Sequence, residues 1–193
     1  MSDRPAADVP GSTEDVVALL VRQHGEIRNL FDEVEASTGE ARVDAFRRLV
    51  RLLSIHETAE EEVVHPYARR AFDGGEGVVE DRLREERDAK ERLSRLDRMD
   101  PSDPRFLPEL LALRTAVMAH ARAEERYEFI HLQRSTNAKQ RATMAKALKA
   151  AEATAPTRPH PGVETGGRNL LFGPVAAVVD RARDMVRKVW GGG

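Results

Sequence analysis

Apolar side chains recur every three or four positions through most of residues 12–153, which is the spacing of amphipathic α-helices. Turn-forming residues interrupt this pattern at Gly39, at 73–75 and at 100–104. The pattern therefore predicts five helices, over about 13–36, 40–72, 78–99, 108–134 and 136–153. Pro66 lacks the amide hydrogen that a helix uses, so we expect a bend near the end of the second helix.

The first four predicted helices form two similar halves. The apolar stripe of the first helix contains His24, and the stripe of the third helix contains Glu86 at the equivalent place, 62 residues later. The stripes comprise Val17, Val21, Ile27, Phe31 and Val34 in the first helix and Val79, Leu83, Ala89, Leu93 and Leu96 in the third. A duplicated helical hairpin explains why the two helices share one pattern of apolar positions with a single ionisable residue within it.

Each half also carries a His-x-x-x-Glu step on its second helix. His56 and Glu60 form one step, and His120 and Glu124 form the other, 64 residues later. Four residues correspond to about 400° of helical rotation, so both side chains of a step share one face, which here is the apolar face. Burying such groups without partners costs roughly 2–7 kcal/mol each, and a bound metal ion is the simplest compensation. The six candidate ligands are His24, His56, Glu60, Glu86, His120 and Glu124.

Two of the six have a simpler interpretation when they are considered alone. His24 would then be a core histidine with a hydrogen-bond partner, and Glu86 would pair with Lys90 on the helix surface. Glu61 and Glu125 lie about 100° off the apolar stripe. We interpret them as solvated groups or as partners of the ligands.

Three further residues lie close to the predicted ligands. His65 stands nine residues after His56, about 180° round a regular helix, so it is predicted to point away from the centre. A distortion at Pro66 would make it a reserve ligand. Tyr67 and Tyr127 are predicted to flank the ligand layer, either as packing groups or as phenols near the metal ions.

These motifs resemble those of the hemerythrin-like (HHE cation-binding) domain family. The segments that carry the resemblance, within residues 13–134, are LLVRQHGEIRNLF, HETAEEEVVHPY and HARAEERYEFI. The resemblance implies an all-α, antiparallel up-down four-helix bundle that holds a non-haem di-iron centre. The family normally places a histidine on the third helix, where this chain has Glu86, so the ligand role of Glu86 is inferred from register alone.

The resemblance implies two non-haem iron ions as the cofactor, with manganese or zinc as alternatives that suit the same imidazole and carboxylate donors. Glu60 and Glu124 are expected to bridge the ions, and His24, His56 and His120 to bind terminally. Glu86 would take the remaining terminal position. Because an anionic ligand stabilises ferric iron, we expect a centre that oxidises readily and does not carry O2 reversibly.

Three functions remain open at this point. The leading hypothesis is a di-iron protein that binds or reacts with O2, peroxide or NO in redox and iron homeostasis or sensing. The second is an oxidase-type enzyme, a ferroxidase or one that decomposes peroxide, so whether the chain is an enzyme stays undecided. The third is a metal-free adaptor bundle that acts through a C-terminal helix.

Composition limits the classes of site and the cellular location that we expect for the protein. The chain has 193 residues, a net charge of −2 and no cysteine, which excludes disulfides and thiolate metal sites and gives no reason to expect nucleic-acid binding. No signal core or membrane span is evident, so a cytoplasmic location is expected. The predicted organisation is a disordered N-terminus (1–11), the bundle (12–134), an additional helix (135–153), a Pro/Gly linker (154–173) and an amphipathic C-terminal helix with a Gly tail (174–193). For that last helix we rank self-packing first, a protein partner or dimer contact second and a membrane third, because aspartates alternate with its arginines.

Overall fold

The computed structural model describes residues 14–159, and every regular element among them is helical. The predicted all-α fold is confirmed. The long helices are α1 (Val16–Ala36), α2 (Gly39–Ala59), α4 (Gly75–Leu96), α5 (Phe106–Ala123) and α7 (Ala138–Glu152). The short segments are η1 (Glu60–Val64), α3 (His65–Ala71), η2 (Glu124–Glu128) and α6 (Phe129–Ser135).

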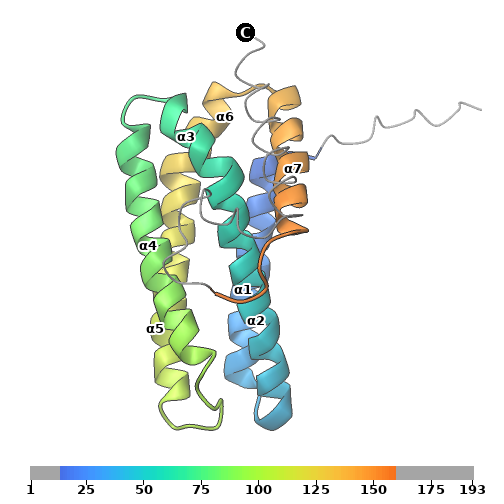
Figure 1. The fold of residues 1–193 in the computed structure, drawn as a ribbon, viewed down its shortest axis with the longest axis vertical. Helices are drawn as coiled ribbons and strands as arrows, with labels where there is room; N and C mark the ends of the chain where they lie inside the picture. The colour runs from blue at the N-terminus through green and yellow to red at the C-terminus, as the bar shows by residue number, and fades with distance from the viewer. Residues whose placement is uncertain (1–13, 160–193) are drawn as a thin grey trace, which may run out of the picture.

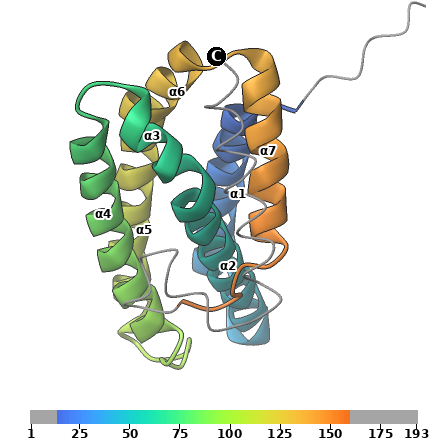
Figure 2. The same cartoon turned by 45° about the horizontal axis from the view of Figure 1, so that its top comes forward.

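The helices form two antiparallel hairpins that pack into a bundle. One hairpin is α1 with α2, and the other is α4 with α5 (Figure 1). The additional helix α7 lies against α1, α2 and η1, on the side away from α4, and both views show this (Figures 1 and 2). The bundle is therefore covered by a fifth helix over half of its length.

Local chemistry sets several helix ends. Asp15 caps α1 by accepting a hydrogen bond from the amide of Val17 at 2.9 Å. Asn137 and Gln140 form a reciprocal capping box at the start of α7. Gly74 has a φ of 85°, and a Cβ on Gly75 would lie 2.3 Å from the carbonyl oxygen of Ala68, so the turn between α3 and α4 requires glycine at both positions.

The second and fourth predicted helices are confirmed in extent, but neither is a regular α-helix throughout. A π-helical segment of five residues interrupts each of them, starting at Glu60 in the first half and at Glu124 in the second. Pro66 occupies the first turn of α3, but the second half has no proline there, so proline is not the shared cause. What the two segments share is a buried carboxylate at their first residue, and π segments are frequent at functional sites.

Two apolar clusters occupy the bundle, and the candidate ligands lie between them. One cluster joins the start of α1 to α7 and includes Leu20, Val63 and Phe129. The other fills the opposite end and includes Phe31 and Leu93. Val21 was predicted to belong to the core but is 44% exposed, which corrects the stripe of the first helix.

Several predictions fall on residues outside the described range. These are the disordered N-terminus at 1–11, most of the linker at 154–173 and the amphipathic helix at 174–193. Within residues 14–159, none of the helices combines the length and the apolarity that crossing a bilayer requires.

Candidate metal centre

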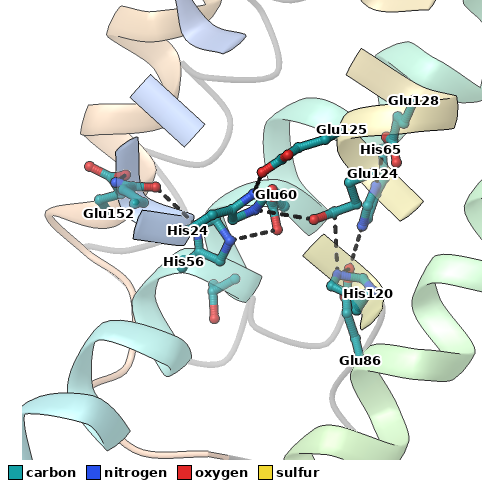
Figure 3. A network of polar contacts seen from close by, with 12 residues as sticks. His24, His56, Glu60, His65, Glu86, His120, Glu124, Glu125, Glu128 and Glu152 are labelled. Carbon is teal, nitrogen blue, oxygen red and sulfur yellow. Dashed lines mark hydrogen bonds and ion pairs between the residues drawn. The ribbon is translucent and has the colours of Figure 1, made fainter. Parts of the chain in front are cut away.

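The structure brings all six sequence-predicted ligand residues together in one buried layer (Figure 3). Their donor atoms form two groups, and the atoms of each group lie within 4.8 Å of one another. The first cluster consists of His24, His56, Glu60 and Glu124. The second cluster consists of Glu60, Glu86, His120 and Glu124. Glu60 and Glu124 belong to both clusters, which is the position that was predicted for bridging carboxylates.

The atoms that face one another across this layer are not hydrogen-bonded. Both oxygens of Glu60, both oxygens of Glu124 and the Nε2 atoms of His24 and His120 are buried without a hydrogen bond. The Nε2 atoms of His24 and His120 each lie 3.3 Å from an oxygen of Glu124. Ligands of one metal ion at bonds of about 2.0–2.2 Å stand about 3 Å apart, so this spacing suits a coordinated cation. Unsatisfied buried donors and acceptors of this kind otherwise cost free energy.

The Nδ1 atoms of the three imidazoles are all held from outside the layer. The Nδ1 atom of His56 lies 2.9 Å from Oε1 of Gln23, that of His120 lies 3.0 Å from Oε2 of Glu85, and that of His24 lies 2.8 Å from Oε1 of Glu125. Because each of these oxygens accepts the Nδ1 proton, Nε2 is left free to bind a metal ion. Such a contact also fixes the orientation of the ring.

Two of these acceptors are themselves positioned by a neighbour. The amide nitrogen of Gln23 donates to Glu152 at 2.5 Å, so the additional helix α7 is linked to the first cluster (Figure 3 shows Glu152 beside His24 and His56). In the second half Arg82 donates to Glu85 at 2.8 Å. The sequence reasoning missed Gln23 and Glu85. The repeat could have revealed them, because each stands one position before the single ligand of its half, again 62 residues apart.

Burial and neighbouring charges shift the pKa values of the layer in opposite directions. Burial, reinforced by the Glu124 carboxylate, raises the pKa of Glu60 well above its usual value. Burial also acts to raise the pKa of Glu124, but the imidazoles of His120 and His24 outweigh it and hold that pKa well below its usual value. Burial, together with the nearby His24, lowers the pKa of His56 to about 3, so this imidazole is neutral. A neutral imidazole beside carboxylates is the state that binds metal ions.

The prediction that His65 points away from the centre is wrong. The π segment η1 inserts extra backbone between Glu60 and His65, so the imidazole turns into the bundle and is 2% exposed. Its Nε2 lies 2.6 Å from Oε1 of Glu86, and its Nδ1 lies 3.1 Å from Oε1 of Glu128. Burial opposes protonation, but the two carboxylates prevail and raise the pKa of His65 well above its usual value. His65 is therefore a cation between two buried carboxylates.

Lys90 does not form the surface pair that was considered for Glu86. Lys90 is buried and its ammonium binds Glu61, while Glu86 is 1% exposed and faces the second cluster. Glu57, which the sequence reasoning did not single out, is buried nearby, and burial raises its pKa to about 8. It follows His56 directly and is therefore one helical position away from the ligand face.

The two tyrosines, both of which are predicted to flank the ligand layer, lie in different surroundings. Tyr67 is buried, and its hydroxyl donates to the carbonyl oxygen of Ser135 at 3.2 Å. Tyr127 lies inside η2 and is 53% exposed, so its predicted place beside the ligand layer is wrong. The changed register of the π segment explains this, because it turns Glu128 and Phe129 inward instead.

Comparison with known proteins agrees with the geometry. The sequence profile of the hemerythrin HHE cation-binding domain matches residues 15–132. A DNA nickase from Nostoc sp. is 28% identical over 140 residues, which are 72% of this chain and 38% of that protein, so the chain spans well under half of the relative's length.

A solved structure has the same fold. The crystal structure of a hemerythrin HHE cation-binding domain-containing protein from Mycobacterium kansasii matches 88% of this chain and 99% of its own chain, with a TM-score of 0.65 and 20% identity. The buried histidine and glutamate groups described above are compatible with metal binding. The chain belongs to the hemerythrin HHE cation-binding domain family.

Proposed function

We propose that this protein is a hemerythrin-like non-haem di-iron protein that binds or reacts with O2, peroxide or NO in redox and iron homeostasis or sensing. The observation that carries the proposal is the pair of four-residue donor clusters that share Glu60 and Glu124. Two adjacent clusters with common carboxylates suit two ions held by bridging ligands, as in other carboxylate-rich helical bundles.

The donor set indicates which residues would hold the ions. His24 and His56 would bind one ion, Glu86 and His120 would bind the other, and Glu60 and Glu124 would bridge them. Nitrogen and oxygen donors without thiolate suit iron, and they also accept manganese or zinc. When bound, two ferrous ions supply the electrons that reduce O2 or peroxide.

The surrounding chain leaves little space beside the centre. A cavity of about 10 Å³ adjoins the ligand layer, which is room for about one water-sized molecule. Its walls include the apolar side chains of Ile27, Leu53 and Val117, all of them buried or nearly so. A small uncharged or singly charged ligand fits such a space, whereas a metabolite of ordinary size does not.

Anaerobic loading with Fe(II) followed by exposure to O2 tests the proposal. We expect about two iron ions per chain and a visible ferric absorption that persists under vacuum, because the Glu86 carboxylate favours the ferric state. A matched pair of variants controls the assignment. Glu60→Gln/Glu124→Gln should lose the iron and the absorption, and the exposed Glu109→Gln should keep both. An iron-free protein, or an absorption that disappears when O2 is pumped away, would contradict the proposal.

A further inference from the structure

We propose that the groove between α1 and α5 is the path by which small anions reach the metal centre, with Met118 at its narrowest point. This inference rests on the proposed function, because it concerns access to that same centre. It adds a class of small molecule that reaches the metal ions and the route that this molecule takes. Neither follows from the metal-binding residues themselves.

The groove opens from solvent directly onto a candidate ligand. It has a volume of about 560 Å³, and α1 contributes Val21, His24, Gly25 and Arg28 to its lining. The helix α5 and the start of η2 contribute Arg114, Thr115, Met118, Ala121, Arg122 and Glu125. Gly25 carries no side chain, so the groove floor stays open directly beside His24.

The groove and the inner cavity are separated by a thin wall. Three residues, His24, Met118 and Ala121, line both the groove and the cavity beside the ligand layer. His24 is fixed by Glu125 and Ala121 is short, so Met118 is the flexible member of this wall. A rotation of its unbranched side chain would join the two spaces.

The charge of the groove favours anions. Three guanidinium groups line it, those of Arg28, Arg114 and Arg122. Arg114 binds Asp32 and Glu35, and the carboxylate of Glu125 is held by His24. Arg28 and Arg122 are exposed and supply the remaining positive charge at the mouth. Cationic clefts with low-dielectric walls concentrate anions and accelerate their association.

The equivalent side of the bundle, between α2 and α4, carries larger buried groups. Under the internal repeat, Arg28 corresponds to Lys90 and Ala121 corresponds to Glu57. Lys90 is buried against Glu61, and Glu57 is buried and itself lines the inner cavity. Larger inward-facing groups thus stand between α2 and α4, where the side between α1 and α5 has an alanine and an outward-facing arginine. The groove arises from this difference between the two sides of the bundle.

Azide is a suitable probe, because it is a small anion whose binding to ferric iron is visible by absorbance. Met118→Trp should slow azide binding to the iron-loaded protein about tenfold or more and leave the equilibrium constant nearly unchanged, since a narrowed path slows entrance and exit alike. Met99→Trp, at a half-buried methionine in the turn after α4, is the matched control and should leave the rate unchanged.

A second set of variants tests the charge of the groove separately from its width. Arg28→Gln/Arg122→Gln should slow azide binding about threefold at low ionic strength and weaken its salt dependence. The same variant should not slow NO, which is neutral. Arg47→Gln/Arg84→Gln removes two exposed arginines outside the groove and should change neither rate.

A measurement on the metal-free protein separates the groove from the metal centre. Azide should shift the amide NMR signals of Gly25 and Thr115 in the wild type, and these shifts should be lost in Arg28→Gln/Arg122→Gln. Iron-loaded protein whose azide rate is unchanged by Met118→Trp would overturn the route, and absent NMR shifts would overturn the anion selectivity. Failure to hold iron would instead overturn the proposed function, and the route with it.

Discussion

The two halves of the bundle share one backbone design but place different chemistry beside the two clusters. In one place the cationic His65 lies between the carboxylates of Glu86 and Glu128. At the place related to it by the internal repeat, Phe129 stacks on His24 with ring centroids 5.7 Å apart. The residue equivalent to Glu128 is Val64, which is fully buried. The charged triad of His65, Glu86 and Glu128 thus corresponds to the triad of Phe129, His24 and Val64, called the His24 triad, and each triad draws residues from both halves.

The comparison shows how the protein accommodates a carboxylate at position 86. An isolated carboxylate in a helical bundle is costly, and its attraction to a neighbouring cation has to offset the loss of hydration. Here the offset is local, because His65 contacts both Glu86 and Glu128. The equivalent site has the imidazole of His24 in place of a carboxylate, so it needs no such cation, and the ring of Phe129 packs there instead.

The largest expected effect comes from His65→Phe, which introduces the side chain found at the equivalent position. It leaves two buried carboxylates without their cation, so the free energy of unfolding of the metal-free protein should fall by about 3–5 kcal/mol. Denaturant unfolding measures this. Phe129→Leu is the control in the His24 triad and should lower the free energy of unfolding by less than about 1.5 kcal/mol.

Copying the His24 triad to the equivalent positions tests whether the charged triad accounts for this loss of stability. The variant His65→Phe/Glu86→His/Glu128→Val places the residue types of the His24 triad at the three equivalent positions. It should recover most of the stability that His65→Phe alone loses, because the two carboxylates that paired with His65 are then absent as well. If the triple variant is no more stable than the single one, the charged triad is not the reason for the loss.

The next effect concerns the acceptors behind the imidazoles. Gln23→Ala should weaken binding of one metal ion about 10- to 100-fold, and Glu85→Ala should do the same for the other, because each removes the group that orients a ligand ring. Competition with a chelator measures both affinities. Glu152→Gln keeps a hydrogen-bonding oxygen next to Gln23 and should have a smaller effect. Loss of both ions in either single variant would show that the two clusters are not separable.

Replacing the Glu86 carboxylate should change the reduction potential of the metal centre. Glu86→His gives the second cluster the neutral donor of the first, so the reduction potential of the iron-loaded protein should rise by roughly 60 mV, a tenfold change in preference for one electron. Spectroelectrochemistry measures the shift. A potential that stays constant while the iron content is preserved would mean that Glu86 does not bind the metal ion.

The smallest effect is a pH dependence that only one half has. Glu57 has a pKa of about 8 in the folded protein against a usual 4.5, while its counterpart Ala121 does not titrate. Between these values the folded state holds a proton that the unfolded state has lost. Raising the pH therefore lowers the free energy of unfolding, by about 1.4 kcal/mol for each pH unit.

The variant Glu57→Gln should remove this contribution. Without metal, its stability relative to the wild type should increase as the pH rises from about 5.5 to 6.5. Thermal unfolding at both pH values measures the difference, and Glu109→Gln serves as the exposed control. An advantage that is the same at both pH values would contradict the assignment.

The helical fold and the six converging residues could be predicted because both depend on periodicity within single helices. His56 with Glu60 is such a case, since a four-residue step fixes a shared face whatever the helix packs against. The positions of His65 and Tyr127 could not be predicted in this way. His65 follows one π segment and Tyr127 lies within the other, and the extra residue of such a segment rotates the positions after it by about 100°.

The acceptors Gln23 and Glu85 show an intermediate case. Their repeat spacing was visible in the sequence, but their partners were not, because His56 and His120 reach them from other helices. Glu152 lies still further along the chain, 129 residues after the glutamine that it binds. A contact of that kind depends on how α7 docks onto the bundle.

The sequence by itself determined that this protein is a duplicated helical hairpin with imidazole and carboxylate groups on its apolar faces, because helical rotation per residue is nearly constant. Tertiary structure decided which of those groups are paired. It placed His65 against Glu86, left a groove beside His24 and filled the equivalent place with Glu57 and Lys90. The physical reason is that burial and charge pairing depend on neighbours from other helices, and no single helix encodes them.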